Sequence, residues 1–153
     1  IVTRADAMPW EAGHPVSYFK TALGLVLLRE QILGPERFDF AFRTYIRAWA
    51  YKHPSPSDFF RTMSSVGGED LSWFWRGWFF HNWNLDLAVT KVAYRGTPAG
   101  GAVVTLASLD RLVLPATVQI AFADGSKQRV RVPVEAWIRQ ATLELPIDST
   151  QCS

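Results

Sequence analysis

The sequence predicts an α+β fold in which a helical subdomain comes first and a small antiparallel β-sandwich follows. Apolar residues recur at helical spacing in the part of the chain before residue 85, which also holds six of the seven tryptophans. From about residue 85 onward, apolar and polar residues alternate in short runs rich in Val, Thr and Leu, as in half-buried strands. This change of pattern predicts two domains, residues 1–84 and residues 85–153.

The first expected helix covers residues 16–33, where apolar side chains occupy nearly every face. A helix with this pattern is predicted to be buried on most sides. Gly34 and Pro35 mark its end and the start of the next helix, because Gly favours the C-terminal end of a helix and Pro its first position. The residues before this helix, Gly13 to Pro15, are expected to form a loop.

Three more helices complete the helical part. The second has an apolar stripe that we expect to be buried, formed by Phe38, Phe42, Tyr45, Ile46 and Trp49. The third begins at Ser55, which can cap it, with Pro56 in the first turn and Asp58 placed to complete a capping box. Gly67–Gly68 ends that helix, and a last helix with a heavy aromatic face begins near Asp70.

Five short strands are expected in the second domain. They lie at residues 85–90, 102–106, 118–122, 129–134 and 143–147. Asp124–Gly125 predicts a hairpin turn between the third and the fourth strand. Arg129 and Arg131 share one face of the fourth strand, which most often is a solvated face. Short strands with tight turns favour a small β-sandwich, with an open barrel as the alternative.

Composition and charge narrow the classes of function. Hydrophobic residues make up 48% of the chain and charged residues 20%, as in ordinary globular proteins. The net charge of +2 is too small to indicate a nucleic-acid partner. The longest apolar stretch, Ala22 to Leu28, is far shorter than the ~20 residues of a membrane span. The single cysteine, Cys152, allows no disulfide within the chain, so the cellular compartment stays open.

The common catalytic motifs are absent. The sequence has no nucleophile elbow of the form Gly-x-Ser-x-Gly and no glycine-rich phosphate loop. The three histidines, His14, His53 and His81, are not spaced as metal ligands are, so no metal or cofactor site is expected from this chain alone.

Tyr18 is the candidate catalytic residue. It follows the expected loop at Gly13 to Pro15, from which its side chain could point into a cleft. A tyrosine hydroxyl is protonated at neutral pH and can donate a hydrogen bond. Such a donor stabilises an oxyanion as a tetrahedral intermediate forms. From position alone, anchoring of a helix start is the simpler interpretation.

A series of short segments at defined spacing resembles the aminopeptidase N family of zinc metallopeptidases, the gluzincins. The segments are residues 18–23, 28–30, 33–38, 42–45, 52–59 and 70–79. The first reads Tyr-Phe-Lys-Thr-Ala-Leu, and the last reads Asp-Leu-Ser-Trp-Phe-Trp-Arg-Gly-Trp-Phe. Together they cover roughly residues 16–80, about half of the chain. The zinc motif of the family, His-Glu-x-x-His, is absent.

The resemblance implies that the chain is the end of a thermolysin-like catalytic domain followed by the β-sandwich that most of the family carries. Tyr18 takes the position of the tyrosine that binds the oxyanion opposite the zinc. Phe19 and Thr21 depart from the commonest form of the motif, Tyr-Glu-Lys-Gly, so fine substrate preference does not transfer. Zinc, its ligands and the glutamate base would lie upstream in a parent enzyme, and this chain alone would be inactive. The implied partners are that zinc-binding subdomain and a peptide substrate, and the isolated chain is expected to self-associate.

Two other functions are compatible with the sequence. One is a catalytically dead relative that serves as a protein-interaction scaffold, with an exposed rim of Trp and Phe between Trp73 and Trp83. The other is a helical module joined to a carbohydrate-binding sandwich. The second is weaker, because the β-half offers only Tyr94 and Trp137 for stacking on a sugar.

Overall fold

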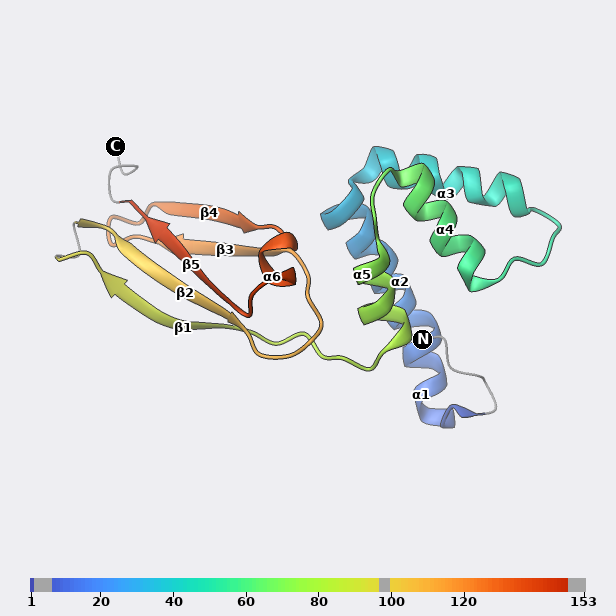
Figure 1. The fold of residues 1–153 in the computed structure, drawn as a ribbon, viewed down its shortest axis with the longest axis horizontal. Helices are drawn as coiled ribbons and strands as arrows, with labels where there is room; N and C mark the ends of the chain where they lie inside the picture. Colours follow the sequence, from blue (N-terminus) through green and yellow to red (C-terminus); the bar gives the residue numbers. More distant parts are fainter. Residues whose placement is uncertain (2–6, 97–99, 149–153) are drawn as a thin grey trace. The chain divides into compact units, whose positions relative to one another are not determined.

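The computed structural model describes residues 1, 7–96 and 100–148 of the chain. The chain divides into two compact units, Ile1–Asn82 and Trp83–Ser153, whereas the sequence places the boundary between residues 84 and 85. The first unit is helical and the second holds the strands, so the protein has the predicted α+β fold with a small β domain (Figure 1). Cys152 lies outside the described residues.

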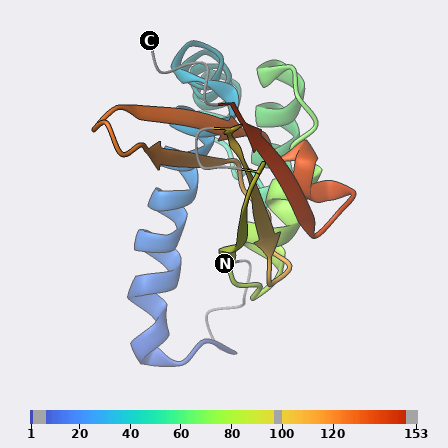
Figure 2. The ribbon, with the colours of Figure 1, turned by 90° about the vertical axis from the view of Figure 1, so that its left-hand side faces the viewer.

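The helical unit opens with four helical segments that follow one another without a break (Figure 2). They are α1 (Trp10–His14), the π-helical η2 (Pro15–Lys20), α2 (Thr21–Leu27) and the π-helical η3 (Leu28–Leu33). The loop predicted at Gly13 to Pro15 is therefore wrong. Pro15 has a helical φ of −57°, and it stands at the first position of a π-helical turn. The fixed φ of a proline is compatible with helical backbone, so the helix continues through Pro15 although Pro is disfavoured inside a regular helix.

This helix is less buried than its composition predicts. Five of its large apolar side chains are more than half exposed, namely Trp10, Tyr18, Phe19, Leu23 and Val26. Its buried positions include Gly24, Leu28 and Leu33. Gly24 lies against Trp78 of η4 (Trp75–Phe80), and Leu33 lies against Gly67 of α4 (Pro56–Gly67). Partners within the described helical unit therefore cover one side of the helix, and its composition alone does not reveal this.

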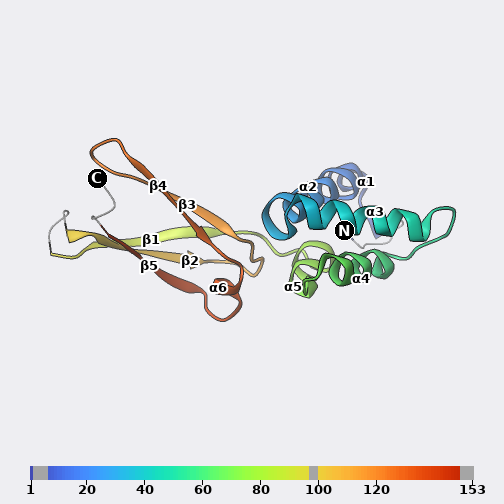
Figure 3. The same ribbon diagram turned by 90° about the horizontal axis from the view of Figure 1, so that it is seen from above.

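Gly34, with φ of +82°, separates η3 from α3 (Pro35–Trp49) as predicted. Helix α3 packs along α4 (Figure 3). Phe38 and Ala41 are buried, and the rings of Phe42 and Tyr45 meet Phe59 edge to face. Of the stripe predicted to be buried, only Phe38 is fully so. Phe42, Tyr45 and Trp49 are partly buried, and Ile46 is half exposed.

The core of the helical unit is an aromatic cluster, formed by Phe60, Phe74, Trp75, Trp78 and Phe79. Residues from α4, α5 (Ser72–Phe74) and η4 contribute to it. The ring of Phe60 stacks on Trp75 with 4.6 Å between centroids, and Phe74 stacks on Trp78 at 6.0 Å. The exposed tryptophan rim predicted between Trp73 and Trp83 is therefore wrong for Trp75 and Trp78, which fill the core instead.

The start of α4 has the predicted capping box. The Asp58 N–H donates to the Ser55 Oγ at 3.4 Å, and the Ser55 N–H donates to the Asp58 carboxylate at 2.9 Å. Hydrogen bonds from Ser55 hold the pKa of the Asp58 carboxyl below its usual value. Two backbone N–H groups of the first turn are thereby satisfied.

Replacing Ser55 by alanine is expected to lower the free energy of unfolding of the helical unit by about 1 kcal/mol, because the cap is lost. Urea denaturation followed by tryptophan fluorescence measures this change. Ser57→Ala is the matched control, since Ser57 is an exposed serine in the same turn but not part of the capping box. Equal losses in the two variants would contradict a specific capping role.

The second unit has the five predicted strands in two antiparallel sheets. One sheet has the order β1 (Leu87–Tyr94), β2 (Ala102–Ser108), β5 (Thr142–Ile147), and the other is the hairpin of β3 (Ala116–Ala121) and β4 (Lys127–Val132). Gly125 has φ of +87° in the turn between β3 and β4, as the sequence predicts. Side chains from both sheets meet in one core, whose buried members are Val104, Leu106, Val132, Trp137 and Ile147. The unit is therefore a small β-sandwich (Figure 3).

A short helix, α6 (Glu135–Ile138), was not predicted. It places Trp137 in the core of the sandwich with 5% of its surface exposed. No helix in the described ranges has both the length and the apolar character that a crossing of a membrane requires.

Candidate functional site

Tyr18 projects from the middle of a helical rod rather than from a loop. It belongs to η2, and 65% of its side-chain surface is exposed. The hydroxyl makes no hydrogen bond with another group among the residues that the structure describes, so it is free to bind an external acceptor. π-Helical turns inside longer helices occur frequently at functional sites.

His14 is a titratable neighbour of Tyr18 on this helix. Its ring lies 5.1 Å from the ring of Tyr18, centroid to centroid, with the planes tilted by 43°. The two residues are four positions apart, the spacing that brings side chains together on one helix face. Sequence reasoning missed this pair because it expected a loop at His14, and the spacing alone would have indicated it once the helix is extended to Trp10.

At Lys20, two residues after Tyr18, a hydrogen bond joins this helix to the aromatic cluster. The Trp78 indole N–H donates to the carbonyl oxygen of Lys20 at 3.0 Å. The Lys20 ammonium lies 5.8 Å from the centre of the Trp78 ring, within the range of a cation–π interaction. Gly24 permits this close approach, because a Cβ at that position would lie 2.3 Å from the indole nitrogen. Tyr18 therefore stands on a segment whose position is set by the buried core.

Charged side chains in this unit hold the helices together rather than form a reactive cluster. The Arg29 guanidinium donates to both carboxylate oxygens of Asp39, at 2.8 and 3.0 Å, and also contacts Glu30. The hydrogen bonds from Arg29 hold the pKa of the Asp39 carboxyl below its usual value. This pair links η3 to α3 across the break at Gly34.

The cavities lie elsewhere. An apolar hollow of about 320 Å³ in the helical unit is lined by Thr21, Leu25, Phe59 and neighbouring residues, but not by Tyr18. A larger cavity of about 440 Å³ lies in the sandwich and also has an apolar lining. No Asp, Glu, Lys, Arg or His side chain lines either of these two cavities.

The described residues do not fit a zinc centre. Among them, no three His, Cys, Asp or Glu side chains come together as a metal site. His14, His53 and His81 lie in three different segments, and each is exposed.

The two aromatic residues considered for stacking on a sugar, Tyr94 and Trp137, do not form a common surface. Trp137 is buried in the sandwich, whereas Tyr94 is 61% exposed. Arg129 and Arg131 are exposed, as the sequence predicts for a solvated face, and Arg129 donates to the Gln119 side chain at 3.2 Å. A sugar platform built from Tyr94 and Trp137 is therefore excluded.

Comparison with known proteins gives a similarity of fold. The chain matches no protein-family model, and no curated protein sequence matches it. The crystal structure of Legionella pneumophila aminopeptidase A in complex with aspartic acid superposes on 88% of the chain with a TM-score of 0.58 and 14% sequence identity. The matched part is 15% of that protein. The fold of this chain is thus similar to part of an aminopeptidase.

Proposed function

We propose that the chain is the C-terminal part of a zinc-dependent metallopeptidase of the aminopeptidase N type and that Tyr18 supplies its oxyanion donor. The observation that carries this proposal is the similarity of fold to part of an aminopeptidase, which extends over 88% of the chain. The spacing of the segments between residues 16 and 80 supports it independently, because that spacing is a property of sequence and not of fold.

The chemistry of Tyr18 suits this role. As water adds to a peptide carbonyl, negative charge develops on the carbonyl oxygen, and a hydrogen bond to that oxygen strengthens as the charge grows. The Tyr18 hydroxyl is exposed and uncommitted within the described residues, while Trp78 holds the backbone at Lys20 in place. A fixed donor needs little reorganisation when the charge develops.

The metal and the general base do not belong to this chain in the proposal. The described residues provide no zinc site, so a preceding segment of a longer protein would hold the ion, which in such enzymes polarises the carbonyl and activates water. The chain by itself is then expected to hydrolyse no peptide.

Elemental analysis of the longer protein that contains this chain tests the proposal. About one zinc ion per chain and hydrolysis of aminoacyl p-nitroanilides that a chelator abolishes are the expected results. A protein that takes up no zinc even after reconstitution, and hydrolyses none of these substrates, would overturn the proposal.

That negative result would favour the second candidate, a peptidase relative without activity that binds other proteins. The observation in its favour is the exposed apolar surface of the first helix at Tyr18, Phe19, Leu23 and Val26. Surface of this kind is typical of interfaces. The predicted self-association of the isolated chain would use the same surface.

A further inference from the structure

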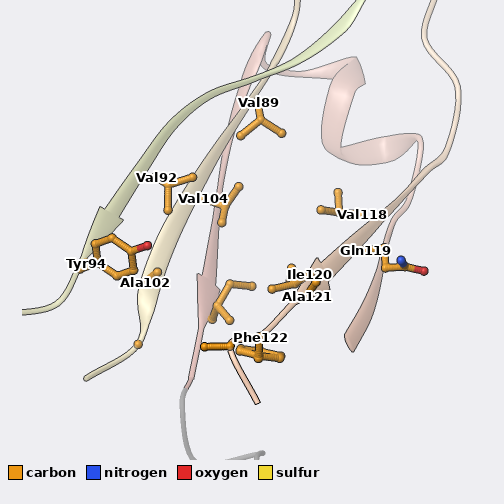
Figure 4. Close-up of a pocket in the computed structure, with 13 residues that line it drawn as sticks. Val89, Val92, Tyr94, Ala102, Val104, Val118, Gln119, Ile120, Ala121 and Phe122 are labelled. Atoms are coloured by element: carbon orange, nitrogen blue, oxygen red, sulfur yellow. The ribbon is translucent and has the colours of Figure 1, made fainter. Parts of the chain in front are cut away.

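The cavity of about 440 Å³ in the sandwich is bounded on one side by β1 and on the other by β3. Val92 and Tyr94 of β1 and Val118 and Ile120 of β3 project into the same space (Figure 4). The side chains of Val92 and Tyr94 are still more than half exposed. The cavity is therefore an apolar slot that the sandwich leaves partly uncovered.

One wall of the slot ends in a free strand edge. Strand β1 is the outer strand of its sheet and pairs only with β2 in the described part of the chain. The Arg95 N–H donates to the Gly101 carbonyl at 2.9 Å. Since hydrogen-bonded pairs alternate with outward-facing pairs in an antiparallel ladder, the peptide groups of Tyr94 and Val92 point away from β2. Val92 and Tyr94 therefore line the slot and also carry, beside it, N–H and C=O groups that are not used in pairing with β2.

The opposite wall has a matching edge. The Phe122 N–H donates to the Ser126 carbonyl at 3.0 Å in the β3–β4 hairpin. By the same alternation the peptide groups of Ala121 and Gln119 point away from β4. These two residues line the slot although the Gln119 side chain points away from it (Figure 4). The slot therefore opens between two strand edges.

Charge indicates what kind of strand would fit. Lys91 alternates with Val92 and so lies on the outer face of the sheet, where it is exposed and forms no ion pair with a described residue. Arg95 follows on the same face and pairs with Asp148 at 3.2 Å. A second copy of β1 would bring like charges together, whereas a strand with acidic residues at alternate positions would be attracted.

We propose that the β1 edge binds an extended peptide by strand addition, with apolar side chains of the peptide in the slot and acidic side chains beside Lys91. Opposite Val92 and Tyr94, the peptide would form hydrogen-bonded pairs, so its side chains there project to the slot side. Backbone hydrogen bonds supply affinity and the slot selects alternate apolar side chains, as in other cases of strand addition. This site lies in the sandwich, and the proposal does not depend on the role given to Tyr18.

The test uses the 153-residue chain and a fluorescently labelled peptide of alternating Glu and Val with blocked ends. Fluorescence anisotropy should show saturable binding of the peptide. The affinity should fall about tenfold when Lys replaces Glu in the peptide, and about tenfold when Val92→Pro removes one edge N–H from the protein. Proline is tolerated at a strand edge, and the N–H of Val92 is not used in pairing with β2. Hydrogen exchange of the Val92 and Tyr94 amides should slow when the peptide is bound.

A pair of modified peptides keeps the test independent of how Val92→Pro folds. N-methylation of the Val residues, which face the edge of β1, should abolish binding, and N-methylation of the Glu residues should preserve it. Equal binding of the two peptides would overturn strand addition. The proposal would also be overturned if dodecanoic acid saturates the slot while the peptide does not bind, because the slot would then hold a small apolar ligand. It would equally be overturned if hydrogen exchange at Val92 and Tyr94 slows with rising chain concentration alone, because a second copy of the chain would then cover the edge.

Discussion

If the chain belongs to the proposed metallopeptidase, replacing Tyr18 by phenylalanine in that longer protein is expected to lower kcat about 100-fold, as is usual when one oxyanion donor is removed. The free energy of unfolding should stay nearly unchanged, because the hydroxyl makes no hydrogen bond within the described residues and the side chain is 65% exposed. The loss should appear in kcat and in kcat/KM together, with little change in KM, because the hydrogen bond strengthens in the transition state. Steady-state kinetics with an aminoacyl p-nitroanilide measures it.

Tyr51→Phe is the matched control for this variant. Tyr51 is a fully exposed tyrosine of the same unit, so this change removes a phenol hydroxyl without touching the η2 segment. Its kcat should equal that of the unmodified enzyme. Unchanged turnover in Tyr18→Phe would remove Tyr18 from the mechanism, whatever the zinc content of the enzyme.

Local signals in the sequence predict the ends of several elements correctly. The capping box at Ser55 and Asp58 and the turn at Asp124–Gly125 depend on a few neighbouring residues, which the sequence shows directly. The five strands follow from alternation in the same way. The capping box and the turn are decided by contacts within a few residues of the chain. The strands also need distant partners, as when β2 pairs with β5.

Features that depend on distant contacts are predicted less well. The apolar composition of residues 16–33 does not reveal that partners in the helical unit cover one side only, which leaves Phe19 and Leu23 exposed. The scaffold hypothesis places Trp75 and Trp78 on a rim, but both fill the core, where Trp75 packs on Phe60 and Trp78 on Phe74. At the candidate site, Tyr18 is indicated by family resemblance, while its neighbour His14 depends on a helix that continues through Pro15.

Gly24 is a position in the helical unit where a single methyl group is expected to have a large effect on stability. A Cβ there would lie 2.3 Å from the indole nitrogen of Trp78, closer than any real contact of this kind. The indole cannot move aside at low cost, because Trp78 is buried and stacks on Phe74. Gly24→Ala is therefore expected to lower the free energy of unfolding by about 3 kcal/mol, from overpacking and from the loss of the hydrogen bond to Lys20.

Gly13→Ala is the control for the change in helix propensity. Gly13 lies in α1, and the nearest atom to a Cβ at Gly13 would be the Met8 sulfur at 4.0 Å, which is an ordinary contact. Alanine is favoured over glycine within a helix by about 1 kcal/mol, so this variant should be as stable as the unmodified chain or slightly more stable. Opposite signs for the two Gly→Ala changes, measured by urea denaturation, would attribute the loss at Gly24 to the contact with Trp78.

The double variant Gly24→Ala with Trp78→Leu tests the same contact from the other side. Trp78→Leu alone opens a cavity and removes the hydrogen bond to Lys20, so it too should destabilise the unit. If the indole obstructs the new methyl group, Gly24→Ala should lower the free energy of unfolding far less in the Trp78→Leu background than in the unmodified chain. The loss in the double variant should then be smaller than the sum of the losses in the two single variants. Additive losses would mean that Gly24 is needed for some other reason. In the non-additive case the packing of Gly24 on Trp78 is what holds the backbone at Lys20, and with it the segment that carries Tyr18.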